Sequence, residues 1–106
     1  MISIVEVAPG ACGLLARIEC EADDAHNVTV RIQSDCPQVQ ALAVRLRGIA
    51  VLEEMRKPMP ETAVYRAAGQ SRMHISCPVP GAILKAVEVA AGLAFPADVH
   101  ITLRRA

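Results

Sequence analysis

The sequence has almost no aromatic side chains, with one Tyr, one Phe and no Trp among 106 residues. It therefore lacks the stacking platforms with which proteins bind single-stranded nucleic acid. An excess of charge of one sign is also missing, because eleven basic and eleven acidic residues leave no formal net charge. No basic cluster offsets that balance, so a nucleic-acid-binding surface is not expected.

Long hydrophobic runs are missing too. No stretch reaches the roughly eighteen apolar residues that a membrane-spanning helix needs, and residues 1–7 lack the basic and apolar regions of a signal peptide. We therefore expect a soluble cytoplasmic protein that folds as a single domain over residues 1–106 and has no membrane partner. Hydrophobic residues make up 53% of the chain, so its core should be aliphatic and rich in alanine.

The motifs of common enzymes are absent, since the chain has no paired carboxylates, no phosphate-binding loop and no Gly-rich dinucleotide motif. A non-enzymatic protein is therefore the favoured interpretation. A catalytic pair formed by Cys77 and the nearby His74 stays open as an alternative.

Three segments near the N-terminus have the alternating pattern of β-strands. They are Ile2 to Ala8, Leu14 to Ala22, and Val28 to Gln33, and the polar turn formers from Asp23 to Asn27 should close a hairpin between the last two. Cys20 shares the apolar face of the second strand. We predict that this thiol points into the core and is chemically inert.

The remainder of the chain alternates helical patterns with loops. Asp35 and Gln38 fit a capping box at the start of a helix whose apolar stripe extends to Ile49. Two short helical segments, 51–55 and 61–68, should follow, and then a helix from Pro80 to Gly92.

Residues 99–103 alternate apolar and polar side chains once more, which predicts a final strand on the same sheet. The predicted fold is thus α+β. It comprises an antiparallel sheet of three N-terminal strands plus a C-terminal strand, with the helices packed on one face.

The four cysteines carry the main functional signal. In a cytosolic domain they favour reduced, metal-bound or catalytic thiols over disulfides. Cys12 lies between the first two strands, Cys36 follows the third strand, and Cys77 precedes the last helix. In an antiparallel meander the first connection and the end of the third strand lie at the same end of the sheet, so Cys12 and Cys36 can approach each other.

A helix packed on the sheet could bring Cys77 to that same end and complete a three-thiolate site. Such a site suits zinc or an iron–sulfur cluster. The fourth ligand could be His74, an Asp, an exogenous thiol or a partner protein. Because no CxxC pair is present, the alternative is that these cysteines only pack near loops.

The order and spacing of three short motifs resemble those of U-type (NifU-like) iron–sulfur cluster assembly scaffolds. The motifs are Pro9-Gly10-Ala11-Cys12-Gly13, Asp35-Cys36-Pro37 and His74-Ile75-Ser76-Cys77. The resemblance implies a cluster held by the three cysteines and protein partners in sulfur or cluster transfer. The chain departs from that family at Leu14, where its members usually carry Asp, and at Ser76, where they carry His.

A second resemblance concerns Cys77-Pro78-Val79-Pro80, which looks like the CPxP motif of SirA-like sulfur carriers. In that family the cysteine carries a persulfide at a helix N-terminus, where the helix dipole favours a thiolate. A persulfide carrier is therefore one alternative function. A non-catalytic structural or interaction domain is another.

Overall fold

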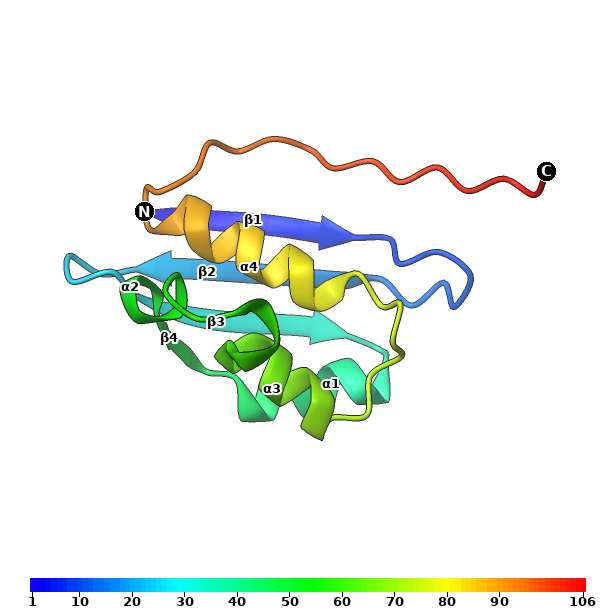
Figure 1. Ribbon diagram of the computed structural model, residues 1–106, viewed down its shortest axis with the longest axis horizontal. Coiled ribbons are helices and arrows are strands. Elements are labelled where there is room, and N and C mark those ends of the chain that lie inside the picture. The colour runs from blue at the N-terminus through cyan, green and yellow to red at the C-terminus, as the bar shows by residue number, and fades with distance from the viewer.

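The fold is built on a four-stranded antiparallel sheet with the strand order β1-β2-β3-β4 (Figure 1). The structure is a computed structural model that describes residues 1–106. Its strands are β1 (Ile2–Val7), β2 (Ala16–Ala22), β3 (Asn27–Ser34) and β4 (Gly48–Ala50). The helices are α1 (Pro37–Arg45), α2 (Val51–Glu54), the short 3-10 helix η1 (Met59–Glu61), α3 (Ala63–Gln70) and α4 (Val79–Ala90). No helix is both long and apolar enough to span a membrane.

Strand alternation divides the sheet into a covered face and an open face. On β2 the covered face carries Ala16, Ile18 and Cys20, all buried, and β3 adds the buried Val28 and Val30. The open face carries the charged residues of the same strands. Salt bridges join strands across it, from Arg17 to Glu6 and from Arg31 to Glu19 and Glu21.

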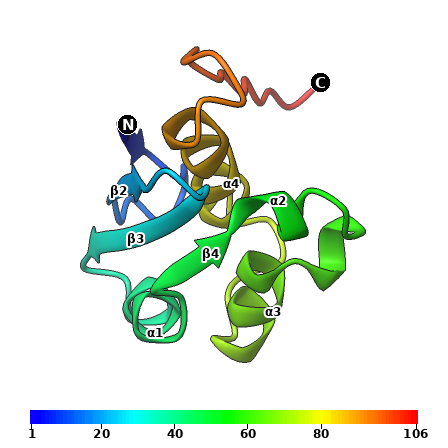
Figure 2. The same cartoon turned by 90° about the vertical axis from the view of Figure 1, so that its left-hand side faces the viewer.

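Helix α4 covers β1 and β2 and buries Ile83, Val87 and other apolar residues against them (Figure 2). Ser3 faces this helix, and its hydroxyl donates to the carbonyl oxygen of Ala86 at 2.6 Å. The helix closes at Gly92, which has φ +76° and lies beside the Met1 side chain. Because α4 ends beside the start of β1, it begins near the other end of that strand.

The structure confirms the predicted α+β class but corrects the fourth strand. The segment Val99–Leu103 is not a strand, and residues 94–106 make no backbone hydrogen bond. The fourth strand is instead β4, where Gly48 pairs with Thr29 and Ile49 with Val28. Alternating apolar residues were sufficient to suggest a strand at the C-terminus, but a strand also needs a paired neighbour, and this segment has none.

The helix predicted to extend to Ile49 ends earlier. Helix α1 stops at Arg45, the chain becomes extended at Leu46, and Ile49 is buried from β4. Spacing of three residues between Leu46 and Ile49 fits a helical stripe, yet both side chains reach the core from extended backbone. A residue with no β-carbon, Gly48, lies between them and interrupts helical propensity.

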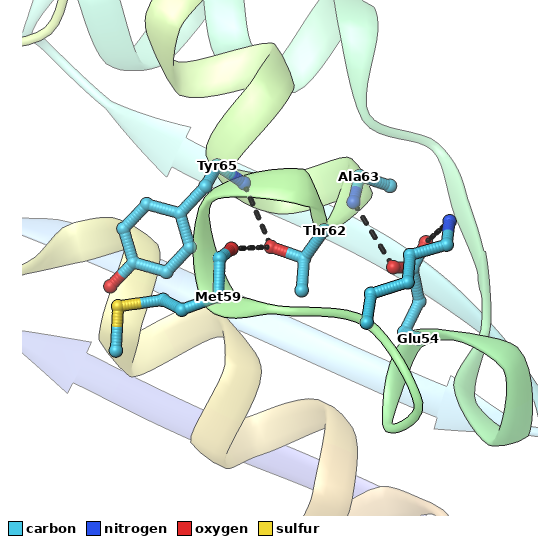
Figure 3. Close-up of polar contacts among 6 residues, drawn as sticks. Glu54, Met59, Thr62, Ala63 and Tyr65 are labelled. Atoms are coloured by element: carbon cyan, nitrogen blue, oxygen red, sulfur yellow. Dashed lines mark hydrogen bonds and ion pairs between the residues drawn. The ribbon is translucent and has the colours of Figure 1, made fainter.

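A buried carboxylate organises the chain between α2 and α3 (Figure 3). Glu54 accepts a hydrogen bond at Oε2 from the backbone N–H of Ala63 at 3.2 Å and pairs through Oε1 with Lys57 Nζ at 3.3 Å. The hydroxyl of Thr62 accepts from the N–H of Tyr65 and so caps α3. These contacts satisfy two of the free N–H groups at the start of α3, those of Ala63 and Tyr65.

Candidate functional site

Three cysteine-bearing segments lie at one end of the sheet. Val7 pairs with Ala16, and Ala16 pairs with Ser34, so the β1–β2 connection and the start of α1 share that end. Figure 1 shows the start of α4 at the same end, at the right of the view. We call this region, with Cys12, Cys36 and Cys77, the cysteine end.

Cys12 is exposed at the tip of the β1–β2 connection. It lies in a tight turn closed by a hydrogen bond from the N–H of Gly13 to the carbonyl oxygen of Gly10 at 3.0 Å. The φ angles of Gly10 and Gly13 are +99° and +69°, a region that favours glycine. The two flanking glycines thus shape the turn that presents this thiol to solvent.

Cys36 is half-buried at the N-cap of α1, ahead of Pro37. Its backbone N–H donates to Ser34 Oγ at 3.1 Å, and the same hydroxyl donates to the carbonyl oxygen of Leu15 at 2.8 Å. The Cys36 thiol donates to Gln38 Oε1 at 3.2 Å. One serine therefore fixes the Cys36 turn and ties it to the end of the Cys12 loop.

The capping box predicted for α1 is wrong. The N-cap is Cys36, and no side chain caps the helix. Gln38 could close such a box only by reaching back to the backbone of Asp35, but it accepts from the thiol instead. Sequence spacing alone did not reveal the bond between Cys36 and Gln38. The Ser34 turn was open to prediction, because a Ser hydroxyl often bonds the backbone N–H two residues further on.

Cys77 is half-buried two residues before α4. Its N–H donates to the carbonyl oxygen of His74 at 3.0 Å, which closes a turn over residues 74–77. The His74 side chain is exposed. Both Cys77 and Cys36 pack against the edge of the hydrophobic core, so two of the three thiols are supported by the body of the protein.

Cys20 contrasts with these three. Its side chain is fully buried at 0% exposure, so the prediction that it points into the core is confirmed. Burial raises the pKa of the Cys20 thiol to about 11. At neutral pH the thiol is protonated and enclosed, which keeps it unreactive.

The cysteine end does not hold a completed ligand set. No three His, Cys, Asp or Glu side chains are arranged to hold a metal ion. The structure brings the segments of Cys12, Cys36 and Cys77 to one end of the sheet, with His74 one turn before Cys77, but not into one coordination sphere. Metal binding by these four residues therefore stays a prediction.

The geometry describes a small α+β domain that presents cysteines beside the starts of two helices. Within that class, the chain belongs to a family of unknown function, DUF6951, whose match covers residues 3–103. No curated protein and no solved structure matches the chain.

Proposed function

We propose that the protein binds zinc or an iron–sulfur cluster at the cysteine end, with Cys12, Cys36 and Cys77 as thiolate ligands and His74 as a candidate fourth ligand. The observation that supports this proposal is the shared location of three segments that are far apart in the sequence. Thiolate and imidazole are donors that both zinc and iron–sulfur clusters accept.

Binding requires the Cys12 loop to move, because the ligands are not yet gathered. The Gly10–Gly13 turn is exposed. Residues 8–13 lie outside the strands, and their one backbone hydrogen bond is the Gly13-to-Gly10 bond that closes the turn. Cys36 and Cys77 are anchored against the core. Closure of the loop over these two thiols would order the loop, so part of the binding free energy would be used in ordering it.

The test is protein produced and purified without oxygen, followed by metal and sulfide analysis and an absorption spectrum. We expect bound zinc, or iron with sulfide, which is lost in Cys36→Ser and in Cys77→Ser. Cys20→Ser is the matched control, because it removes a thiol outside the site. Circular dichroism confirms that each variant is folded. Metal-free wild-type protein, or equal loss in the control, would contradict the proposal.

A second candidate function is a persulfide sulfur carrier. The observation that favours it is that Cys77-Pro78-Val79-Pro80 leads directly into α4, with Cys77 half-buried at the helix start. The Cys77 thiolate would attack the terminal sulfur of a donor cysteine persulfide. The donor sulfur–sulfur bond breaks, the donor leaves as a thiolate, and the transferred sulfur with its proton stays on Cys77.

The same anaerobic preparation separates the two candidates. If mass spectrometry finds one additional sulfur atom on Cys77 of metal-free protein, the result would support the persulfide carrier. Protein with neither metal nor persulfide would support a structural or interaction domain. Partners in sulfur or cluster transfer are part of both site-based proposals, since both kinds of cargo are passed to another protein.

A further inference from the structure

The two edges of the sheet differ in how well they are protected. Edge strand β4 has three residues and continues directly into α2. Edge strand β1 has six residues, pairs with β2 in uninterrupted register, and contains no proline or lysine. Its outer backbone groups have no strand partner, and Ile2 and Ile4 are 56% and 52% exposed. A long, regular and apolar edge of this kind accepts a further strand.

The C-terminal segment has the complementary properties. Residues 94–106 are without secondary structure or backbone hydrogen bonds, although their apolar residues alternate as in a strand. Val99, Ile101 and Leu103 are 58%, 73% and 90% exposed. Figure 2 shows this segment leaving the end of α4 and passing over that helix, on the helix side of the sheet, and it makes no hydrogen bond with β1. The chain thus carries an unused strand donor and an unused strand acceptor.

We infer that residues 101–106 pair as a strand with β1 of a second copy of this chain. A parallel arrangement matches their side chains, with Ile101 opposite Ile2, Leu103 opposite Ile4, and Arg105 opposite Glu6. The antiparallel register that keeps both apolar pairs, with Leu103 opposite Ile2 and Ile101 opposite Ile4, would set Val99 against Glu6 and leave Arg105 with no partner in β1. Neighbouring apolar pairs and opposite charges stabilise adjacent strands, so the residues favour the parallel register.

Exchange between two copies can be reciprocal. Each copy then donates one C-terminal strand and accepts one at β1, which gives a closed two-fold dimer with two identical joints. The exposed Ile2 and Ile4 of β1 gain apolar neighbours, Ile101 and Leu103 of the second copy, in the same step. Because the cysteine end takes no part in these joints, this inference is independent of the proposed metal or sulfur chemistry.

The first test measures the mass of the full chain by sedimentation equilibrium over a range of concentrations. We expect a monomer–dimer equilibrium that Thr102→Pro weakens by about tenfold or more, because proline removes a backbone donor and disfavours strand pairing. Thr102 makes no hydrogen bond within the chain, so the substitution leaves the monomer fold intact. Ala97→Pro, in the exposed segment before the paired residues, is the matched control and should dimerise like the wild type.

The second test asks whether pairing occurs between copies. Ile4→Lys adds a charge to the exposed face of β1 and should also prevent dimerisation. A mixture of the Thr102→Pro and Ile4→Lys proteins retains one intact donor and one intact acceptor, so mixing should restore association. A monomer at every concentration, a dimer unchanged by Thr102→Pro, or a mixture that stays monomeric would each overturn the inference.

Discussion

The covered face of the sheet and the cysteine end place the same residue type in opposite environments. On the covered face, strand alternation directs Cys20 into the core, where it is buried and its pKa is raised. At the cysteine end, Cys12 is exposed, while Cys36 and Cys77 are half-buried before helices. The difference shows that backbone position, and not the number of thiols, decides which cysteines of this chain are available for chemistry.

The largest expected effect is on the covered face. Ile18→Ala removes a fully buried side chain between β1 and β3. It should lower the free energy of unfolding by about 2–5 kcal/mol, because it loses hydrophobic burial and leaves a cavity. Urea denaturation measures the change. Val44→Ala on the exposed side of α1 is the control, with an expected change within about 0.5 kcal/mol.

The raised pKa of Cys20 should make the stability of the protein depend on pH above 9. Its pKa is raised from 9.0 to about 11 in the folded protein, so between these values the unfolded chain loses a proton that the folded protein keeps. The stabilisation of the fold by protonated Cys20 is complete below pH 9 and is lost as pH rises toward 11, which lowers the free energy of unfolding by about 3 kcal/mol.

Denaturation of wild type and Cys20→Ala at a series of pH values measures this contribution. The difference between their unfolding free energies should shrink as pH rises above 9, since the variant has no thiol to ionise. A difference that stays constant up to pH 11 would show that burial does not control ionisation of this thiol.

At the cysteine end, Ser34→Ala should have a smaller effect. It removes the hydrogen bonds that Ser34 makes with Leu15 and with the backbone of Cys36, so the unfolding free energy should fall by about 1 kcal/mol. Alkylation of Cys36 should become faster because its turn is less constrained. Ser76→Ala, at an exposed position of the 74–77 turn, is the control and should change neither stability nor Cys36 alkylation.

The smallest effect is expected for Cys12→Ser. The side chain is exposed and contributes no packing, so stability should change by less than about 0.5 kcal/mol. In the native wild type, alkylation should reach Cys12 first and Cys20 last. Fast labelling of Cys20 under native conditions would contradict the contrast between the covered face and the cysteine end.

Sequence patterns predicted the structure correctly where local periodicity alone determines which side chains face the core. Alternation located the first three strands and the inward direction of Cys20, and the helix predicted from Pro80 to Gly92 corresponds to α4. These features depend on local periodicity, which a sequence displays directly. The prediction of an α+β fold followed from them.

Patterns failed where pairing between distant segments decided the outcome. Ile49 fits a helical stripe but reaches the core from β4, and Ile101 fits a strand but has no paired neighbour. The cysteine end shows the same limit. Strand order indicated that the segments of Cys12 and Cys36 lie at one end, whereas the contacts of Ser34 and Gln38 depend on the local turn that forms there.

The Glu54 contacts bear on how this chain could be engineered. The Glu54 carboxylate, at the end of α2, accepts a hydrogen bond from the start of α3 and so holds together the two ends of the loop over residues 55–62. The turn around Lys57 and Pro58 in this loop is exposed. Lengthening an exposed loop costs little entropy once its ends are held together. A fluorescent reporter or affinity tag inserted between Lys57 and Pro58 should therefore leave both the sheet and the cysteine end intact.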